Sequence, residues 1–333
     1  MNLLIIGGGA VSEKFHIPAA ISLLSVDNVY LAEPNGNQAT KLSNMFNLQH
    51  VVTDYKSVLR NVDAVVIATP PHIHAEIMIS CIEAGVPVLC EKPVTLTHEE
   101  ALVVSKANST KNVLIGMCHT YRLFPGRIYA KQRIEEGFFG ENLNIDIQEG
   151  APADWPTVSG YCYRKDLVPG GVLFDAGIHS LDFILWCLGT PSKVEYLDDS
   201  IGGLESNASM KLTFDANKTA TFRISRTCEL SNKITISGSE NSIELDIFEM
   251  DKLKNLNTPT EIQNVKNDSG KAFDWTTIGQ FQLQDFIDSV EGKKSLFCTF
   301  EDGVKAVELI ENCYAQKKER PFPLKATIPG IRF

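Results

Sequence analysis

The stretch Leu3-Leu4-Ile5-Ile6-Gly7-Gly8-Gly9-Ala10-Val11-Ser12 opens the chain and decides its fold. Its four apolar residues are a strand signal, and they lead directly into a G-x-G-x-x-S pattern formed by Gly7, Gly9 and Ser12. In such a pattern the first glycine allows a tight turn, and the second lets the backbone approach a pyrophosphate at a helix start. A flexible surface turn would also use glycine, so the pattern alone leaves both interpretations open.

The residues after this loop favour a dinucleotide site. A second apolar run, Val29 to Ala32, ends at Glu33, which follows Ser12 by 21 residues. An acidic side chain at this position can accept hydrogen bonds from the adenosine ribose hydroxyls, and it would repel a 2′-phosphate. The sequence therefore predicts NAD rather than NADP. The other interpretation of Glu33 is a surface carboxylate at a strand end.

Residues 1–120 alternate short apolar runs with helical patterns, which is typical of a parallel sheet built from βαβ units. We expect an α/β fold with an N-terminal Rossmann domain, a doubly wound parallel sheet, over this range. Pro18 should break or restart the first helix, Gly85 should end a helix over 73–83, and Thr97 should cap the next one. The six apolar runs are Leu3 to Ile6, Val29 to Ala32, Val51 to Thr53, Ala64 to Ala68, Val86 to Cys90 and Val113 to Met117.

After about residue 120 the pattern changes, and we expect a C-terminal α+β domain over 121–333 for substrate binding and oligomerisation. Strand signals that alternate in polarity and are joined by short turns predict an open, mostly antiparallel sheet with one exposed face. These strands are expected at 194–196, 208–214, 219–225, 233–237 and 242–247. Helices are expected at about 126–136, 173–188, 278–290 and 302–316.

The composition excludes several classes of function. The net charge of −10, with no basic stripe, argues against nucleic acid as a partner. No stretch approaches the length of a membrane span, and the first residues do not resemble a signal peptide, so we expect a cytoplasmic protein. The eight cysteines are dispersed without a Cys-x-x-Cys pair, so we predict buried thiols and no metal site.

Three further motifs carry the candidate chemistry, and two of them follow the fourth and fifth apolar runs, where open parallel sheets bind their ligands. Hydride transfer from an alcohol needs a group that takes the hydroxyl proton and a donor that stabilises the developing alkoxide. Lys92 and His179 could supply both, while Asp175, four residues before His179 on one helix face, could orient the substrate. Each residue taken singly could equally be structural. The motifs are Thr69-Pro70-Pro71-His72-Ile73-His74, Glu91-Lys92-Pro93, and Gly170-Gly171-Val172-Leu173-Phe174-Asp175-Ala176-Gly177-Ile178-His179.

With these motifs and Tyr121-Arg122-Leu123-Phe124-Pro125, the chain resembles the glucose-fructose oxidoreductase, inositol dehydrogenase and MocA (Gfo/Idh/MocA) family. The resemblance implies that Lys92, Asp175 and His179 are the catalytic group, with His179 as the proton acceptor. It also implies a homodimer or homotetramer formed through the open face of the second sheet. The implied cofactor-binding residues are Gly7, Gly9, Ala10, Val11, Ser12, Glu33, Thr69, Pro70, His74, Glu91 and Lys92. The implied substrate-binding residues are His119, Tyr121, Arg122, Tyr163 and Arg164.

Two departures from the family pattern stand out: Pro71 replaces a polar residue, often Asn, and His119 occupies a position often held by Asn. The leading hypothesis is an NAD-dependent dehydrogenase or reductase acting on a sugar, sugar nucleotide or cyclitol. One alternative is an NAD-using glycoside hydrolase with no net redox change, and another is a catalytically silent NAD(H)-binding regulator. Arg122 and Arg164 would suit an anionic substrate, or they could be structural ion-pair partners.

Overall fold

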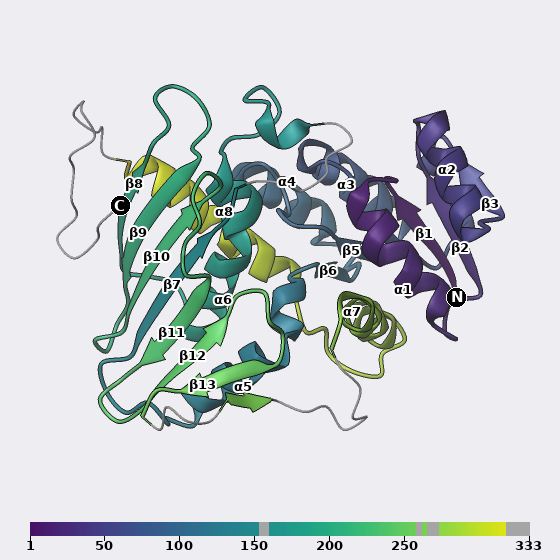
Figure 1. Cartoon of the computed structure of the whole chain (residues 1–333). Helices are drawn as coiled ribbons and strands as arrows, with labels where there is room; N and C mark the ends of the chain where they lie inside the picture. Colours follow the sequence, from purple (N-terminus) through teal and green to yellow (C-terminus); the bar gives the residue numbers. More distant parts are fainter. Residues whose placement is uncertain (153–159, 258–261, 265–272, 318–333) are drawn as a thin grey trace. The chain divides into compact units, whose positions relative to one another are not determined.

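The computed structural model describes residues 1–152, 160–257, 262–264 and 273–317 (Figure 1). They form two compact units. The first unit holds the described residues of 1–123, 155–168 and 272–307, and the second unit holds those of 124–154, 169–271 and 308–333. The units differ from two continuous domains, because residues 160–168 and 273–307 join the N-terminal part. The domain ranges 1–120 and 121–333 stay a prediction.

The first unit contains a six-stranded sheet in the order β3-β2-β1-β4-β5-β6, and every pair in it is parallel. The chain runs outward from β1 through β2 to β3 and then crosses to β4 on the other side of β1, which is the reversal of direction that defines a doubly wound sheet. This confirms the predicted Rossmann fold. The strands are β1 (Asn2–Ile6), β2 (Asn28–Ala32), β3 (His50–Val52), β4 (Ala64–Ile67), β5 (Val88–Cys90) and β6 (Ile115–Met117).

Helices cover both faces of this sheet, which explains why its strands read as continuous apolar runs. Leu4 and Ile6 belong to the core that includes residues of α3 and α4, whereas Leu3 and Ile5 belong to the core that includes residues of α1 and α7. The helices are a π-helix η1 (Ser12–His16), α1 (Ile17–Ser22), α2 (Gly36–Phe46), α3 (His74–Ala84), α4 (His98–Asn108) and α7 (Trp275–Val290). Short 3-10 helices are η2 (Tyr55–Ser57), η3 (Leu59–Asn61), η4 (Pro71–Ile73), η5 (Thr120–Leu123) and η6 (Tyr161–Tyr163).

Three local predictions in this unit are confirmed. Pro18 lies in the first turn of α1, where the π-helix gives way to an α-helix. Gly85 ends α3 with a φ of 73°, a left-handed conformation that glycine adopts without strain. The Thr97 side chain accepts a hydrogen bond from the Glu100 N–H and so caps α4.

The second unit contains an eight-stranded sheet in the order β14-β13-β12-β11-β7-β10-β9-β8. Among the described strands β7 and β10 pair in parallel and the other neighbours are antiparallel, so the prediction of a mostly antiparallel sheet is confirmed. Strands β7, β13 and β14 were not among the predicted strands. The strands are β7 (Asn144–Gly150), β8 (Lys193–Asp198), β9 (Asn207–Thr213), β10 (Thr219–Ser225), β11 (Lys233–Ser237), β12 (Ser242–Asp246), β13 (Lys252–Asn255) and β14 (Ile262–Asn264).

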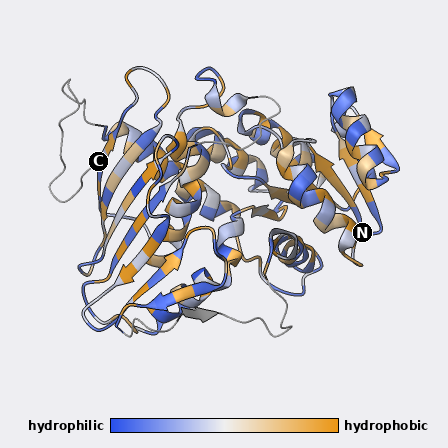
Figure 2. Cartoon of the chain, in the orientation of Figure 1, coloured by the Kyte–Doolittle hydropathy of each residue, from blue (hydrophilic) through white to orange (hydrophobic). Residues whose placement is uncertain are grey.

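Polar and apolar residues alternate along several of these strands (Figure 2). Buried and partly exposed residues alternate with them, which separates a buried face from a polar face. On β10, Ala220, Phe222 and Ile224 are buried, while Thr221 and Arg223 point to the other face and are partly exposed. The helices that accompany this sheet are α5 (Pro125–Glu135), a π-helix η7 (Leu173–Gly177), α6 (Ile178–Leu188) and the last part of α8 (Phe300–Ala315). In the part of the chain that the structure describes, no helix combines the length and the apolar character needed to cross a membrane.

Candidate active site

The glycine loop lies at the carboxyl end of β1, and each of its glycines has a different reason to lack a side chain. Gly7 has a φ of +99°, and a Cβ there would lie 2.6 Å from the backbone oxygen of Ala68. A Cβ on Gly8 would lie 2.9 Å from Oε2 of Glu33. A Cβ on Gly9 would meet no protein atom within 4 Å, so the space in front of Gly9 is open. The loop is therefore packed against the protein at two glycines and open at the third.

Glu33 is bound to the glycine loop itself. Its carboxylate oxygens accept hydrogen bonds from the backbone N–H groups of Gly8 and Asn35, both at 2.7 Å. The side chain is thereby fixed at the end of β2, beside the loop that the sequence predicted it to serve. Gly8 occupies a variable position of the motif, so sequence reasoning missed its close contact with Glu33; the clue was the run of three glycines.

Ser12 occupies the third glycine position and bonds back to the first residue of the loop. The side chain is fully buried, and its hydroxyl donates a hydrogen bond to the Gly7 carbonyl. Ala10 and Val11 are already helical, and the Glu13 N–H donates to the Gly9 carbonyl at 3.0 Å, so a helix begins directly after the loop. A helix start at this place presents backbone N–H groups and a positive dipole end to an anion.

His74 connects the loops after β4 and β5 through hydrogen-bond contacts of its two ring nitrogens. This fully buried ring lies 2.9 Å from the Thr69 carbonyl through Nε2 and 2.8 Å from the Pro93 carbonyl through Nδ1. Burial lowers the pKa of His74 below its usual value, although the two carbonyl groups act in the opposite direction. His74, predicted to line a cofactor, thus has both ring nitrogens directed at backbone carbonyls, and it positions the loop that holds Thr69 and Pro70.

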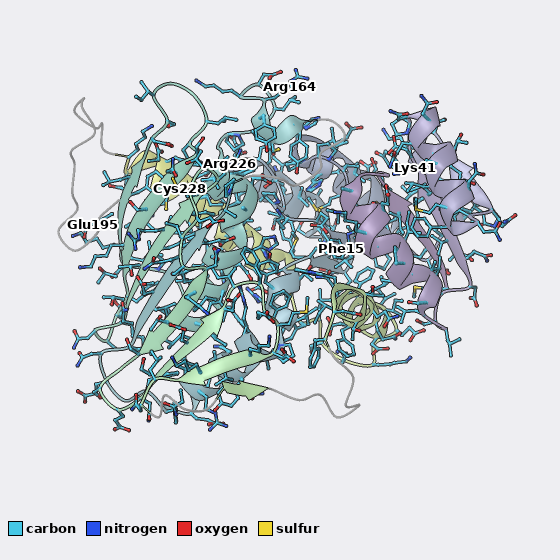
Figure 3. All side chains as sticks on the ribbon, in the orientation of Figure 1. Phe15, Lys41, Arg164, Glu195, Arg226 and Cys228 are labelled. Carbon is cyan, nitrogen blue, oxygen red and sulfur yellow. The ribbon has the colours of Figure 1, made fainter. Side chains whose placement is uncertain are left out.

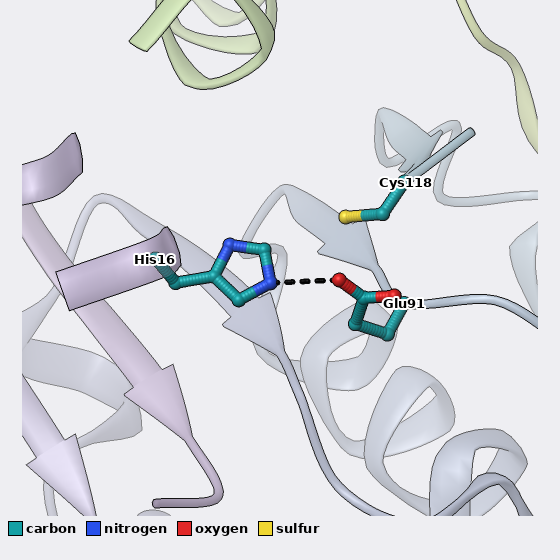
Figure 4. A group of neighbouring side chains, drawn as sticks. All are labelled: His16, Glu91 and Cys118. Atoms are coloured by element: carbon teal, nitrogen blue, oxygen red, sulfur yellow. Dashed lines mark hydrogen bonds and ion pairs between the residues drawn. The ribbon is translucent and has the colours of Figure 1, made fainter. Parts of the chain in front are cut away.

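Glu91 lies directly after β5 in a compact group with His16 and Cys118 (Figure 4). Its Oε1 is 2.8 Å from Nε2 of His16, and its Oε2 accepts a 3.2 Å hydrogen bond from the Lys92 N–H. Burial alone would raise the pKa of Glu91, but the hydrogen bond and charge of His16, together with the charge of Lys92, hold that pKa below its usual value. Glu91 is therefore a fixed anion next to Lys92.

The same group offers a His nitrogen, a carboxylate oxygen and a Cys sulfur within 4.8 Å of one another, which is a possible ligand set for a metal ion. Burial and the nearby Glu91 carboxylate raise the pKa of the Cys118 thiol well above its usual value. The His16 ring and the Glu91 carboxylate already bond each other at 2.8 Å, so we interpret this group as a hydrogen-bonded support for Glu91. The absence of a metal stays a prediction.

Six of the eight cysteines are buried, as predicted, while Cys162 is partly buried and Cys228 is exposed. Cys228 follows β10 closely, in a turn where its N–H donates a 2.8 Å hydrogen bond to the Ser225 hydroxyl.

In the second unit, Asp175 lies on η7 and His179 on the first turn of α6, and both are partly exposed. The sequence predicted an α-helix over this stretch, but residues Leu173–Gly177 form a π-helix, whose wider turn changes the angle between the two side chains. Arg226, labelled in Figure 3, follows β10 directly. Its guanidinium lies 3.6 Å from the Asp175 carboxylate. Sequence reasoning missed Arg226, because no motif connects it with a residue 51 positions earlier.

The five predicted substrate-binding residues all fall in the first unit, in different surroundings. His119 and Arg122 are 1% and 4% exposed, and Arg122 pairs with Asp302 at 3.3 Å. Arg164 forms an exposed ion pair with Asp166, its Nε lying 3.2 Å from the carboxylate. Both arginines thus take part in the structural ion pairs that the sequence left open. The ring of Tyr121 packs against Trp275 of α7, and Tyr163 is 54% exposed.

Comparison with known proteins identifies the family of the chain. Residues 1–119 match the family model described as an oxidoreductase family with an NAD-binding Rossmann fold, and residues 128–244 match the GFO/IDH/MocA C-terminal domain. The chain belongs to the Gfo/Idh/MocA oxidoreductase family. The resemblance drawn from the motifs is therefore confirmed.

Several curated relatives match the chain. A levoglucosan dehydrogenase from Pseudarthrobacter phenanthrenivorans is 32% identical over 209 residues, covering 58% of this chain and 53% of the relative. An NADP-dependent scyllo-inositol 2-dehydrogenase from Bacillus subtilis is 29% identical over 193 residues (57% and 52%), and a 2,7-anhydro-N-acetylneuraminate hydratase from Mediterraneibacter gnavus is 26% identical over 197 residues (56% and 52%). The matched part thus spans about half the length of these relatives.

Among solved structures, a levoglucosan dehydrogenase in complex with NADH and levoglucosan superposes with a TM-score of 0.81 at 22% identity, covering 95% of this chain and 98% of that one. At this identity the similarity establishes the fold. Together the comparisons place the chain in a family whose members include NAD(P)-dependent sugar and cyclitol dehydrogenases.

Proposed function

We propose that this protein is an NAD-dependent oxidoreductase that transfers a hydride between nicotinamide and a secondary alcohol or ketone of a sugar, sugar nucleotide or cyclitol. The observation that carries the proposal is the first-unit sheet, whose carboxyl edge bears both an open glycine loop and the fixed Glu91-Lys92 pair. Open parallel sheets bind ligands at this edge, on both sides of the point where the strand order reverses.

The residues at this edge fit a dinucleotide. The open space at Gly9 leaves room for a pyrophosphate beside the helix start that begins with Ala10. The Thr69 hydroxyl oxygen is buried and finds no hydrogen-bond partner among the described residues, so it is available to a bound ligand. Glu33 places a negative charge beside the loop, which favours the ribose of NAD over the 2′-phosphate of NADP.

NAD, when bound, would supply the hydride acceptor. In the proposal, the pyrophosphate loop is formed by Gly7, Gly9, Ala10, Val11 and Ser12. The cofactor is lined by Thr69, Pro70 and Glu91, and His74 holds the backbone of the Thr69 loop in place. As the family resemblance implies, Lys92 and His179 hold and move the substrate hydroxyl proton, and Asp175 orients the substrate. Arg226 holds the Asp175 carboxylate in place.

The substrate class and the assembly follow from the same family. Relatives named for levoglucosan and scyllo-inositol support a carbohydrate or cyclitol substrate. Tyr163 and Arg164 are exposed and suited to contact it, whereas the buried His119 and Arg122 would position the segment that carries Tyr121. The polar face of the second-unit sheet is proposed to pair with another copy of the chain, giving a homodimer or homotetramer.

The test is a screen of the purified protein with NAD against inositols, free sugars, uronates and nucleotide sugars, in which NADH absorbance and product mass are read together. NADH formed in proportion to consumed substrate supports the dehydrogenase. Product without net NADH would support the glycoside hydrolase. One relative is named as a hydratase, and a hydration involves no net oxidation. Tight NAD binding with no product would support the regulator.

A pair of lysine variants tests the site assignment. Lys92→Ala should lower kcat by about 10²- to 10⁴-fold, the range of a lost acid-base group, while the Kd for NADH stays within about threefold. Lys56→Ala is the matched control, since Lys56 is exposed and pairs with Glu76 at 3.3 Å in the same unit. Activity of Lys92→Ala equal to that of the control would refute the assignment.

A further inference from the structure

The helix that carries Asp175 and His179 begins in the second unit without a capping side chain of its own. The residue before η7 is Val172, whose side chain has no polar atom to accept the N–H groups of the first turn. Three consecutive N–H groups at this helix start are instead accepted by one residue, Glu205, located 34 positions later in the chain. The Gly171 N–H donates to its Oε2 at 2.7 Å, the Val172 N–H to its backbone oxygen at 2.9 Å, and the Leu173 N–H to its Oε1 at 3.0 Å.

The helix start lies so close to Glu205 and Tyr314 that Gly170 and Gly171 have no room for a side chain. A Cβ on Gly171 would lie 2.0 Å from the Glu205 backbone oxygen, and a Cβ on Gly170 would lie 1.8 Å from the Tyr314 hydroxyl. The Gly170-Gly171 pair is thus explained by the close approach of two other segments, one preceding β9 and one in α8. Larger residues at either position would push the helix start away from Glu205.

Tyr314 completes the arrangement from the other side. Its hydroxyl donates a 2.9 Å hydrogen bond to Oε1 of Glu205, which already accepts from the Leu173 N–H. Glu205 is 2% exposed, so water does not compete for these bonds. Burial raises the pKa of Glu205, although the N–H groups of Gly171 and Leu173 and the Tyr314 hydroxyl oppose that effect. A buried carboxyl group with this many donors is a fixed anchor.

We infer that Glu205, held by Tyr314, is a positioning residue that sets where Asp175 and His179 lie, because it fixes the backbone immediately before them. The Asp175 N–H continues the same chain of contacts by donating to the Gly171 carbonyl at 3.0 Å. Misplacing a reacting group by about 1 Å can cost roughly 100-fold in rate. The inference rests on the proposed function for its kinetic consequence, while the ordering of residues 171–173 is independent of any substrate.

The experiment compares Glu205→Gln with wild type in two measurements. An amide offers one carbonyl oxygen in place of two carboxylate oxygens, so its NH2 group must face either the Gly171 or the Leu173 N–H, a contact between two donors. Hydrogen exchange followed by mass spectrometry should show the amides of residues 171–173 exchanging at least about tenfold faster in the variant. With a substrate in hand, kcat should fall by about 10- to 100-fold while the Kd for NADH stays within about twofold.

Asp198→Asn is the matched control. Asp198 is also buried in the second unit and pairs with Lys317 at 2.8 Å, near the end of α8, but among the residues that the structure describes it bonds to Ser200 and Lys317 rather than to residues 171–173. The variant should lose stability without faster exchange at 171–173 and without a change in kcat. Tyr314→Phe serves as a second variant that keeps all three bonds from the N–H groups of residues 171–173 to Glu205, and its kcat should fall by about two- to fivefold.

The outcomes separate the two proposals. Unchanged exchange at residues 171–173 in Glu205→Gln would overturn the inference, and so would faster exchange with a normal kcat. A fall in kcat of the same size in Asp198→Asn would reduce the role of Glu205 to general stability and overturn it as well. A wild type that is inactive on every compound refutes the proposed function, and the exchange measurement then still decides whether Glu205 holds the helix start.

Discussion

Removing the charge of Glu33 should weaken the discrimination between NAD and NADP. The substitution Glu33→Gln keeps the length of the side chain and one oxygen that can accept from the Gly8 N–H, which lies 2.7 Å from the wild-type carboxylate. It eliminates the negative charge that a 2′-phosphate would meet beside the glycine loop. The change therefore isolates the electrostatic part of the cofactor preference.

The size of the effect follows from Coulomb's law. At a separation of about 5 Å and an effective dielectric of about 40, between the protein-surface and bulk-water values, two unit charges repel by about 1.7 kcal/mol. A phosphate monoester carries roughly 1.5 to 2 negative charges at neutral pH, which gives about 3 kcal/mol before screening. Physiological salt reduces this by roughly half at that distance. The ratio of the NADPH and NADH dissociation constants should thus fall by roughly tenfold.

The assay is a fluorescence titration of wild type and variant with NADH and with NADPH at fixed ionic strength. NADH itself should bind somewhat more weakly, because an amide is a weaker acceptor for a ribose hydroxyl than a carboxylate, so the ratio is the informative quantity. Glu13→Gln is the control: it removes one charge from η1, where Glu13 pairs with Lys41 at 2.6 Å, and should change the ratio by less than about threefold. An equal ratio in Glu33→Gln and wild type would show that Glu33 does not face the ribose.

Three further predictions address the loop, the buried histidine and the second unit. Gly9→Ala should keep the wild-type melting temperature but lose at least about tenfold in NADH affinity, because its Cβ enters the open space proposed for the pyrophosphate. Gly7→Ala should have a lower melting temperature, because its Cβ would lie 2.6 Å from a backbone oxygen. Identical melting curves for the two variants would contradict this. Burial lowers the pKa of His74, so the stability contributed by its neutral ring is fully present above about pH 6.5 and is lost as the pH falls through the folded-state pKa, at up to about 1.4 kcal/mol per pH unit. Urea unfolding between pH 7.5 and 5 should therefore show a flatter pH dependence in His74→Gln, and parallel curves would count against this explanation. Arg226→Gln should lower kcat by about tenfold with an unchanged NADH Kd, since the 3.6 Å pairing with Asp175 is lost, and a normal kcat would exclude Arg226 from the site.

The first unit was predictable because its signals are local. The apolar run Leu3 to Ile6 is buried on both sides of the sheet, so its composition alone indicates an inner parallel strand. Gly7 has a φ of +99°, and such a backbone conformation is a local property that selects glycine. The placement of α7 was not predictable, because its amphipathic pattern specifies an apolar face but not the surface that covers it; in the structure Phe286 joins the core that includes Leu3 and Ile5.

The second unit shows where counting along the chain fails. A spacing of four residues between Asp175 and His179 assumes 3.6 residues per turn, and the π-helix between them breaks that assumption. Glu205 lies in a Gly-Leu-Glu-Ser sequence that matches no motif, so the local sequence does not indicate that Glu205 accepts the N–H groups of a distant helix. A signal was nevertheless present: Gly170-Gly171 precedes an apolar helix that has no Ser, Thr, Asp or Asn at its start. Two glycines in front of an uncapped helix imply both a close backbone approach and an acceptor from elsewhere, and this structure supplies both in one residue.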